Sequence, residues 1–254
     1  MTDPAVLARR VLPLIDLTSL TGEEDEAQIV ALCGQARTPA GDVAAVCVDG
    51  RWAAVAAREL DGSPVALAVV ANFPEGDRDP ERARREARQA VADGADEVDV
   101  VLPYGAWIAG DEAGALAVVE AARAAAPPPA RLKVILETGR LRRPDVIRAA
   151  ALAAIDAGAD FVKTSTGKLQ PGATTDAARA MLEAIAERDG AAGFKASGGV
   201  RTTAQAGEYL ALADELLGPA WAAPGTFRFG ASRLLDDVLA ALGERAAGTD
   251  AGGY

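Results

Sequence analysis

The chain has 254 residues, of which 50% are hydrophobic and 25% charged, and its formal net charge at pH 7 is −11. This length allows one large hydrophobic core or two smaller domains. The negative charge argues against nucleic acid as a partner, because two polyanions repel each other. No apolar run is long enough to cross a membrane, and the first residues lack the pattern of a secretory signal.

The residue types that are rare or missing narrow the chemistry further. Histidine is absent, which excludes Ser-His-Asp triads and nearly every metal site built on imidazole. We expect no metal, and we expect no cofactor either. The two cysteines, Cys33 and Cys47, form no Cys-x-x-Cys motif, and a reducing cytoplasm is the expected location. Only four lysines stand beside 22 arginines, so a lysine is a candidate for a role that needs an amine.

Short apolar runs alternate with longer amphipathic stretches along the whole chain. The expected strands cover residues 14–18, 44–48, 66–71, 97–102, 132–137, 161–165, 193–196 and 227–230. The expected helices cover residues 24–37, 51–61, 78–93, 111–126, 143–157, 174–189, 203–217 and 232–242. The arginine-rich run 81–90 interleaves with acidic residues at helical spacing, which is typical of a solvated helix face.

Eight alternating units in about 250 residues predict a single-domain (β/α)8 TIM barrel. Gly94, Gly158 and Gly190 follow their helices directly, as glycines that end helices do. A doubly wound parallel sheet is the alternative, weakened because no Gly-x-Gly-x-x-Gly follows the first strand. We expect the barrel to span residues 1–245 and a flexible tail to span residues 246–254.

Charged residues stand inside several of these strands, where parallel barrels are otherwise apolar. Side chains alternate between the two faces of a strand, and the neighbouring apolar residues take the outward face. Asp16, Asp99, Lys163 and Lys195 should therefore point toward the barrel axis, near the strand ends at which barrel enzymes keep their chemistry.

Lys163 and Lys195 lie on consecutive strands, which are about 4.8 Å apart. At an effective dielectric constant near 20, two ammonium groups about 5 Å apart repel by roughly 3 kcal/mol, or about two pKa units. The plain alternative is a buried ion-pair network that only stabilises the barrel. A purely structural network gains nothing from this repulsion. A nucleophilic amine needs it, because the repulsion lowers the pKa of a lysine and only a neutral amine attacks a carbonyl.

Several segments resemble one known family over nearly the whole chain. They are IDLTSL (15–20), AAVCV (44–48), ANFPEG (71–76), GADEVDVVLPYGAW (94–107), LKVILETGRL (132–141), GADFVKTSTGK (158–168), GFKASGGVRT (193–202) and FRFGAS (227–232). The family is deoxyribose-phosphate aldolase of class I, and the pair DFVKTSTGK and KASGGVRT is its most specific feature. The family's fold is a (β/α)8 barrel.

The resemblance implies reversible joining of acetaldehyde and D-glyceraldehyde 3-phosphate to 2-deoxy-D-ribose 5-phosphate. It assigns the Schiff base to Lys163, and to Lys195 it assigns perturbation of that lysine and proton relay. Asp99 would be the general acid–base, and Asp16 would belong to the same relay. Small aldehydes and phosphorylated sugars are the expected partners; the oligomeric state stays open, with a homodimer as one expectation.

Glycine pairs after the last strands point to a phosphate site, because barrels bind phosphate at the loops after strands 7 and 8. The expected binding residues are Thr18, Thr166, Gly167, Lys168, Gly198, Gly199, Gly230 and Ser232. Arg201, Arg233, Tyr254 and Cys47 are further candidates, although an inert core thiol is the plainer interpretation of Cys47. Arg233 replaces a serine that many relatives carry, so it could meet either phosphate or solvent. Glu137 ends its strand with inward parity and could orient a lysine.

Two other functions stay open at this point. One is a class I aldolase for another aldehyde or keto-acid donor, which would need an extra cation if the donor carried a carboxylate. The other is a phosphate-binding barrel without catalysis, against which the presence of Lys163, Lys195 and Asp99 argues.

Overall fold

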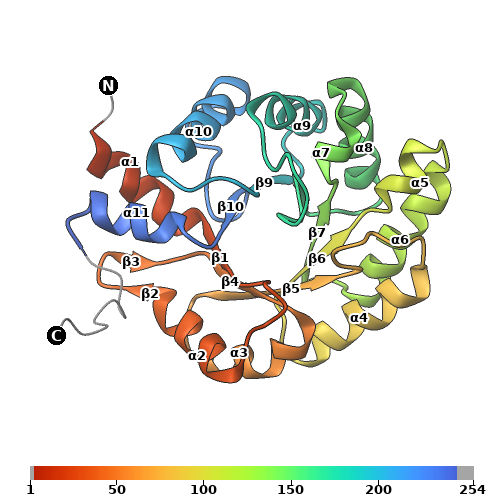
Figure 1. Ribbon diagram of the computed structural model, residues 1–254. Coiled ribbons are helices and arrows are strands. Elements are labelled where there is room, and N and C mark those ends of the chain that lie inside the picture. The colour runs from red at the N-terminus through yellow and green to blue at the C-terminus, as the bar shows by residue number, and fades with distance from the viewer. Residues whose placement is uncertain (1–2, 245–254) are drawn as a thin grey trace.

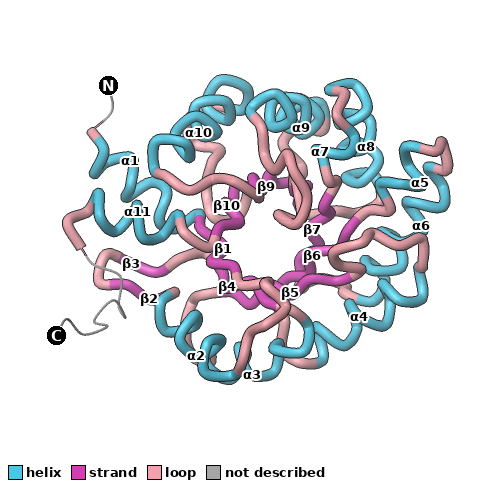
Figure 2. The backbone as a smooth tube through the Cα atoms, viewed as in Figure 1, coloured by secondary structure: helices cyan, strands magenta, loops and turns pink. Residues whose placement is uncertain are grey.

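The computed structural model describes residues 3–244 and shows a closed ring of eight parallel strands surrounded by helices (Figures 1 and 2). The barrel strands are β1 (Ile15–Thr18), β4 (Ala45–Val48), β5 (Ala66–Ala71), β6 (Glu97–Val101), β7 (Arg131–Ile135), β8 (Phe161–Lys163), β9 (Gly193–Ser197) and β10 (Phe227–Ala231). β1 pairs with both β4 and β10, which closes the ring. The TIM barrel prediction is confirmed, and the doubly wound alternative, which has two free edges, is wrong.

Each barrel strand is followed by a helix on the outside of the ring (Figure 1). These helices are α2 (Glu26–Gln35), α3 (Ala53–Leu60), α4 (Pro80–Ala92), α6 (Glu112–Ala125), α8 (Pro144–Asp156), α9 (Thr175–Glu187), α10 (Thr203–Leu217) and α11 (Leu234–Ala241). Gly94, Gly158 and Gly190 have φ angles of +100°, +98° and +72°, as expected for glycines that end helices. In α4, Arg85 and Arg88 are exposed, which confirms the predicted solvated face.

Several small elements were not predicted from the sequence. They are α1 (Pro4–Val11), the 3-10 turns η1 (Leu12–Leu14) and η2 (Gly50–Trp52), the hairpin of β2 (Arg37–Thr38) and β3 (Gly41–Asp42), and the short helices α5 (Tyr104–Ile108) and α7 (Thr138–Leu141). The side chain of Asp3 caps α1, and Pro4 is its first residue, a start signal that the sequence did contain. Residues 245–254, with Tyr254 and the predicted tail, lie outside the described residues.

Strands β7 and β8 both end two residues earlier than predicted, for local reasons. β7 stops at Ile135 because Glu137 has a φ of +53°, in the left-handed region that does not continue a strand. β8 stops at Lys163, and the side chain of the next residue adds two hydrogen bonds to those that its backbone still makes with Lys195 and Thr138. The Thr164 hydroxyl donates to the carbonyl of Ser197 at 3.0 Å and accepts from the Ser197 N–H at 2.9 Å.

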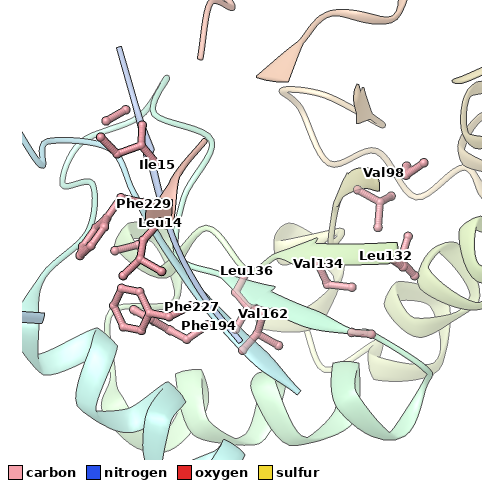
Figure 3. Close-up of a cluster of buried hydrophobic side chains, with 14 of the residues drawn as sticks. Leu14, Ile15, Val98, Leu132, Val134, Leu136, Val162, Phe194, Phe227 and Phe229 are labelled. Atoms are coloured by element: carbon pink, nitrogen blue, oxygen red, sulfur yellow. The ribbon is translucent and has the colours of Figure 1, made fainter. Parts of the chain in front are cut away.

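The hydrophobic core lies between the outer face of the strands and the helices (Figure 3). Phe194, Phe227 and Phe229 form one part of it, with ring centroids 5.4 Å apart for Phe194–Phe227 and 4.9 Å for Phe227–Phe229. Inside the ring, β4 and β5 contribute a small second cluster of Ala45, Cys47, Ala68 and Val70. The remaining strands fill the interior with charged side chains, of which the alternating pattern predicted those of β1, β6, β8 and β9.

Replacement of Phe229 by alanine tests this division of the core. Phe229→Ala should lower the free energy of unfolding by about 3–5 kcal/mol, because it leaves a cavity between β10 and the helices. Ile108→Ala is the matched control: this side chain is 55% exposed, and its loss should change stability by no more than about 0.5 kcal/mol. Urea unfolding followed by circular dichroism measures both, and equal losses would contradict the assignment of the core.

Candidate active site

Asp99 lies at the centre of the charged interior of the barrel. Its Oδ2 accepts from the Nζ of Lys163 at 2.9 Å and from the Nζ of Lys195 at 2.8 Å. Its Oδ1 accepts from the Nζ of Lys133 at 2.7 Å. Burial alone would raise the pKa of Asp99, but the three ammonium groups outweigh burial and hold this pKa well below its usual range. Asp99 is therefore a stable anion to which three lysines are anchored.

Asp16 and Arg228 form a second part of this network, between β1 and β10. Asp16 Oδ2 lies 2.5 Å from the Nζ of Lys195, and its Oδ1 accepts from Arg228 at 2.6 Å. Although burial opposes it, the charges of Lys195, Arg228 and Lys133 lower the pKa of Asp16. Asp16 therefore keeps Lys195 charged from the side opposite Asp99.

Glu97 joins the two parts from below, nearer the amino ends of the strands. Its Oε2 lies 2.5 Å from the Nζ of Lys133, and its Oε1 accepts from Arg228 at 2.9 Å. Glu97, Lys133 and Arg228 are all buried. The interior thus holds one continuous network of three carboxylates and four cations, formed by Asp16, Glu97, Asp99, Lys133, Lys163, Lys195 and Arg228.

The network treats its three lysines differently. Burial lowers the pKa of Lys163, the positive charge of Lys195 adds to this effect, and Asp99 opposes it without reversing it. Burial would also lower the pKa of Lys195, but Asp16 and Asp99 outweigh burial and raise it above the usual range. In the same way, Asp99 and Glu97 outweigh burial and raise the pKa of Lys133. Lys163, with one carboxylate partner, is the lysine that loses its proton most readily.

Sequence reasoning named Lys163, Lys195, Asp99 and Asp16, and the structure brings these four side chains together. Their register agrees, since Lys163 pairs with Lys195 across β8 and β9. Lys133 and Arg228 were missed, although both have the same inward parity as the named residues. The missed signal is a charged residue at an inward position of LKVIL and of FRFG.

A cleft of about 410 Å³ opens at the carboxyl ends of the strands. Its lining includes Thr18, Thr166, Gly167, Lys168, Ser197, Gly198, Gly199, Arg201, Gly230, Ser232 and Arg233. Every residue predicted to bind phosphate therefore lies on this one cleft. The side chains of Lys168, Arg201 and Arg233 are exposed and give it three cations.

Glycine is required at two points of the cleft floor. A Cβ at Gly230 would lie 2.9 Å from Cε of Lys195 and 2.8 Å from Oγ of Ser197, so a side chain there would displace Lys195. Gly198 has a φ of +87°, and its neighbour Gly172 would collide with its carbonyl oxygen if it carried a Cβ. The loops after β8 and β9 can therefore pack backbone against backbone beside the cleft.

Glu137 lies at the edge of the site and fixes the loop after β8. Its Oε2 accepts from the backbone N–H of Thr166 at 3.2 Å and from the Thr166 hydroxyl at 2.5 Å. The Thr166 hydroxyl in turn accepts from the N–H of Lys168 at 3.1 Å. Burial raises the pKa of Glu137, while the bonds from Thr166 oppose the rise. The sequence suggested that Glu137 could orient a lysine. In the structure its hydrogen bonds orient the Thr166–Lys168 turn instead.

Cys47 is buried inside the barrel, in the small apolar cluster of β4 and β5. Burial raises the pKa of the Cys47 thiol, which suppresses the reactive thiolate and fits the inert-thiol interpretation. Thr18 donates its hydroxyl to the carbonyl of Asp16 at 2.8 Å. Tyr254, the remaining candidate, lies outside the described residues.

Within residues 3–244, no group of three or more His, Cys, Asp or Glu side chains is placed to hold a metal ion. No helix in that part of the chain is long and apolar enough to cross a membrane.

A closed (β/α)8 barrel with buried lysines below a cationic cleft is the architecture of a barrel aldolase. Comparison with known proteins agrees: the sequence profile of the DeoC/LacD family aldolases matches residues 10–226. The chain belongs to the DeoC/LacD family of aldolases.

Three solved structures illustrate the relationship. A candidate deoxyribose-phosphate aldolase from Coccidioides immitis is 32% identical, with a TM-score of 0.77 over 91% of this chain and 85% of that chain. A candidate deoxyribose-phosphate aldolase from Toxoplasma gondii ME49 is 26% identical, with a TM-score of 0.85 over 94% of this chain and 97% of that chain. The tetrameric deoxyribose phosphate aldolase of Aeropyrum pernix shares the fold, with 24% identity and a TM-score of 0.72 over 94% and 92% of the two chains.

The three-carboxylate, four-cation network makes a prediction about stability. Lys133→Met should lower the free energy of unfolding at pH 7 by about 3–5 kcal/mol, because Asp99 and Glu97 lose a buried cation. The double variant Lys133→Met/Glu97→Gln removes one of these uncompensated charges and should regain part of the lost free energy of unfolding. Denaturant unfolding of the three proteins measures this, and a double variant that is less stable than Lys133→Met would contradict it.

Proposed function

We propose that the protein is a 2-deoxy-D-ribose 5-phosphate aldolase that works through a Schiff base on Lys163. The observation that carries the proposal is the contrast among the buried lysines: Lys163 and Lys195 share Asp99 Oδ2, and the pKa is lowered for Lys163 and raised for Lys195. A neutral amine beside a charged one is what iminium formation needs, since one attacks and the other donates a proton.

In the synthetic direction, the neutral amine of Lys163 adds to the carbonyl carbon of acetaldehyde and gives a carbinolamine. Lys195 is the proton donor to the carbinolamine hydroxyl, which leaves as water and yields an iminium ion. Asp99 Oδ2, in contact with both nitrogens, stays an anion and holds the two side chains next to each other. Loss of a proton from the neighbouring carbon then gives the enamine, and Lys195, neutral after its donation, accepts that proton.

The enamine carbon next attacks the aldehyde carbon of D-glyceraldehyde 3-phosphate, and a carbon–carbon bond forms. The new alkoxide takes the proton that Lys195 holds. Water then adds to the iminium and releases 2-deoxy-D-ribose 5-phosphate, with Lys163 restored as a neutral amine. The proton that this hydrolysis sets free returns to Lys195, which is then charged as at the start. In this scheme Asp16 holds Lys195 in place from the second side, at 2.5 Å.

Two features support a phosphorylated aldehyde as the acceptor. The cleft above the lysines carries Lys168, Arg201 and Arg233 at its rim, together with the glycine-rich turns after β9 and β10, and exposed backbone N–H groups suit a phosphate. A keto-acid donor fits less well. Its carboxylate would need a cation near Lys163, and Lys133, Lys195 and Arg228 are already paired with carboxylates.

Reduction with borohydride in the presence of acetaldehyde tests the nucleophile. The unmodified protein should gain one reduced ethyl group, which peptide mass mapping places on Lys163. Lys163→Ala should lose the adduct and keep the circular dichroism spectrum of the folded protein. Lys168→Ala is the matched control and should keep the adduct, because acetaldehyde carries no phosphate. An adduct on Lys195 or Lys133 instead would overturn the assignment.

The phosphate end of the cleft is tested at Arg233. Arg233→Ser should raise KM for 2-deoxy-D-ribose 5-phosphate by roughly ten- to a hundredfold, because a charge-assisted contact of about 1.5–3 kcal/mol is lost. KM for unphosphorylated 2-deoxyribose should hardly change. Arg188→Ser, on the outer surface, controls for a loss of positive charge and should alter neither. Equal effects on both sugars would show that Arg233 acts through folding rather than through phosphate.

A further inference from the structure

Glu97 and Arg228 lie at the opposite end of the barrel from the substrate cleft. Both line a cavity of about 590 Å³ at the amino ends of the strands, and neither lines the cleft above the lysines. Arg131, whose side chain is 43% exposed, lies 3.5 Å from Glu97 there. Glu97 and Arg228 are therefore too remote to touch a substrate that is bound to Lys163.

The two residues nevertheless belong to the network that holds the nucleophile. Glu97 contacts Lys133, which contacts Asp99, which contacts Lys163. Arg228 contacts Asp16, which contacts Lys195, which shares Asp99 with Lys163. Two chains of ion pairs thus run from the lower cavity to the proposed nucleophile, one along each side of the barrel.

The formal charges of the network explain how these two series of ion pairs act on the protonation of Lys163. Its three carboxylates are Asp16, Glu97 and Asp99, and its buried cations other than Lys163 are Lys133, Lys195 and Arg228. Arg131, which also pairs with Glu97, is 43% exposed and screened by solvent, so it is not counted among the buried charges. Three negative charges match three positive charges, so the network is neutral when Lys163 is an amine and carries one excess positive charge when Lys163 is an ammonium. A buried excess charge is unfavourable in low dielectric.

We propose that Glu97 and Arg228 are positioning residues that set the protonation state of Lys163 from the far end of the barrel. The proposal rests on the proposed function, in which Lys163 must be neutral to attack an aldehyde. Removal of the Arg228 charge would leave the carboxylates in excess and favour the ammonium form of Lys163. Removal of the Glu97 charge would have the opposite effect.

The expected size of the two effects is similar. β6 and β10 each lie two strands away from β8 in the ring, or about 10 Å at a strand spacing of about 4.8 Å. At an effective dielectric constant near 20, one unit charge at about 10 Å shifts a pKa by about one unit.

Other titratable groups lie around Lys163, and they are the same residues in the Glu97 and Arg228 variants. They are Asp16 on β1, Cys47 on β4, Asp99 on β6, Lys133 on β7, Glu137 just after β7 and Lys195 on β9. Glu137 accepts its hydrogen bonds from Thr166, outside the ion-pair network. A shift that reverses sign between Glu97 and Arg228 variants therefore reports the charges of those two residues.

The scarcity of lysine makes the test direct. Protein labelled with 13C at lysine Cε should give four signals, from Lys133, Lys163, Lys168 and Lys195, and Lys163→Ala identifies the one that titrates as the nucleophile. Arg228→Gln should raise the pKa of Lys163 by about one unit, and Glu97→Gln should lower it by about one unit. The double variant Glu97→Gln/Arg228→Gln should return it close to the original value, and Arg228→Lys, which keeps the charge, should shift it least.

Shifts of the same sign in both single variants, or no shift in either, would overturn the proposal and leave the pair with a purely structural role. Should Arg228→Gln fail to fold, Glu97→Gln carries the test alone, because a downward shift is required. The titration needs no substrate. If the pKa of Lys163 moves as expected and borohydride trapping still fails, the proposed function is wrong and the electrostatic inference stands.

Discussion

The organisation of this protein depends on the burial of one excess positive charge. Three carboxylates inside the barrel face four cations, and every member is at most 2% exposed. Such a network is costly unless its charges and hydrogen bonds are matched. The least matched member, Lys163, has one carboxylate partner, which it shares with Lys195. Its proton is therefore the one that the fold holds least firmly.

The balance between buried carboxylates and buried cations bears on each proposed step of the reaction. A neutral amine is the form that attacks an aldehyde, and the excess charge favours that form. When the iminium ion forms, the positive charge passes from Lys195, which has given up its proton, to the nitrogen of Lys163. Conversion to the neutral enamine returns that charge to Lys195. Lys195 differs because Asp16 and Asp99 raise its pKa, so it stays charged beside the neutral amine and carries the proton that the proposed reaction uses. One fold thus gives two neighbouring lysines opposite chemical tasks.

The barrel frame fixes this geometry at little conformational cost. Residues of the network project from strands whose outer faces are anchored by apolar packing, as with Phe227 and Phe229 on either side of Arg228. Loops after the strands are free to form the cleft without disturbing the lysines.

Much of this could be predicted from alternation alone. The period of two along a strand placed Asp16, Asp99, Lys163 and Lys195 on the inward face, and eight repeated units predicted the barrel. The position of the cleft followed from the rule that barrel sites form at the carboxyl ends of strands. All of these inferences use information that is local in the sequence.

What could not be predicted depends on contacts between strands that are distant in the chain. Arg228 contacts Asp16 and Glu97 because the barrel closes and because its side chain is long enough to cross the interior. The local sequence FRFG predicts neither contact. Repulsion between Lys163 and Lys195 was predicted, but which of the two would lose its proton depends on Asp16, which contacts one of them alone. The left-handed backbone of Glu137 was likewise invisible in a strand-like run.

The most direct test of the central claim is a crystal structure of the protein after borohydride reduction in the presence of 2-deoxy-D-ribose 5-phosphate. The account predicts continuous electron density from the Nζ of Lys163 to C1 of the sugar, with the phosphate between the Gly198–Gly199 turn and Ser232. Density that joins the sugar to another lysine, or an unmodified Lys163 below a phosphate bound elsewhere, would contradict it.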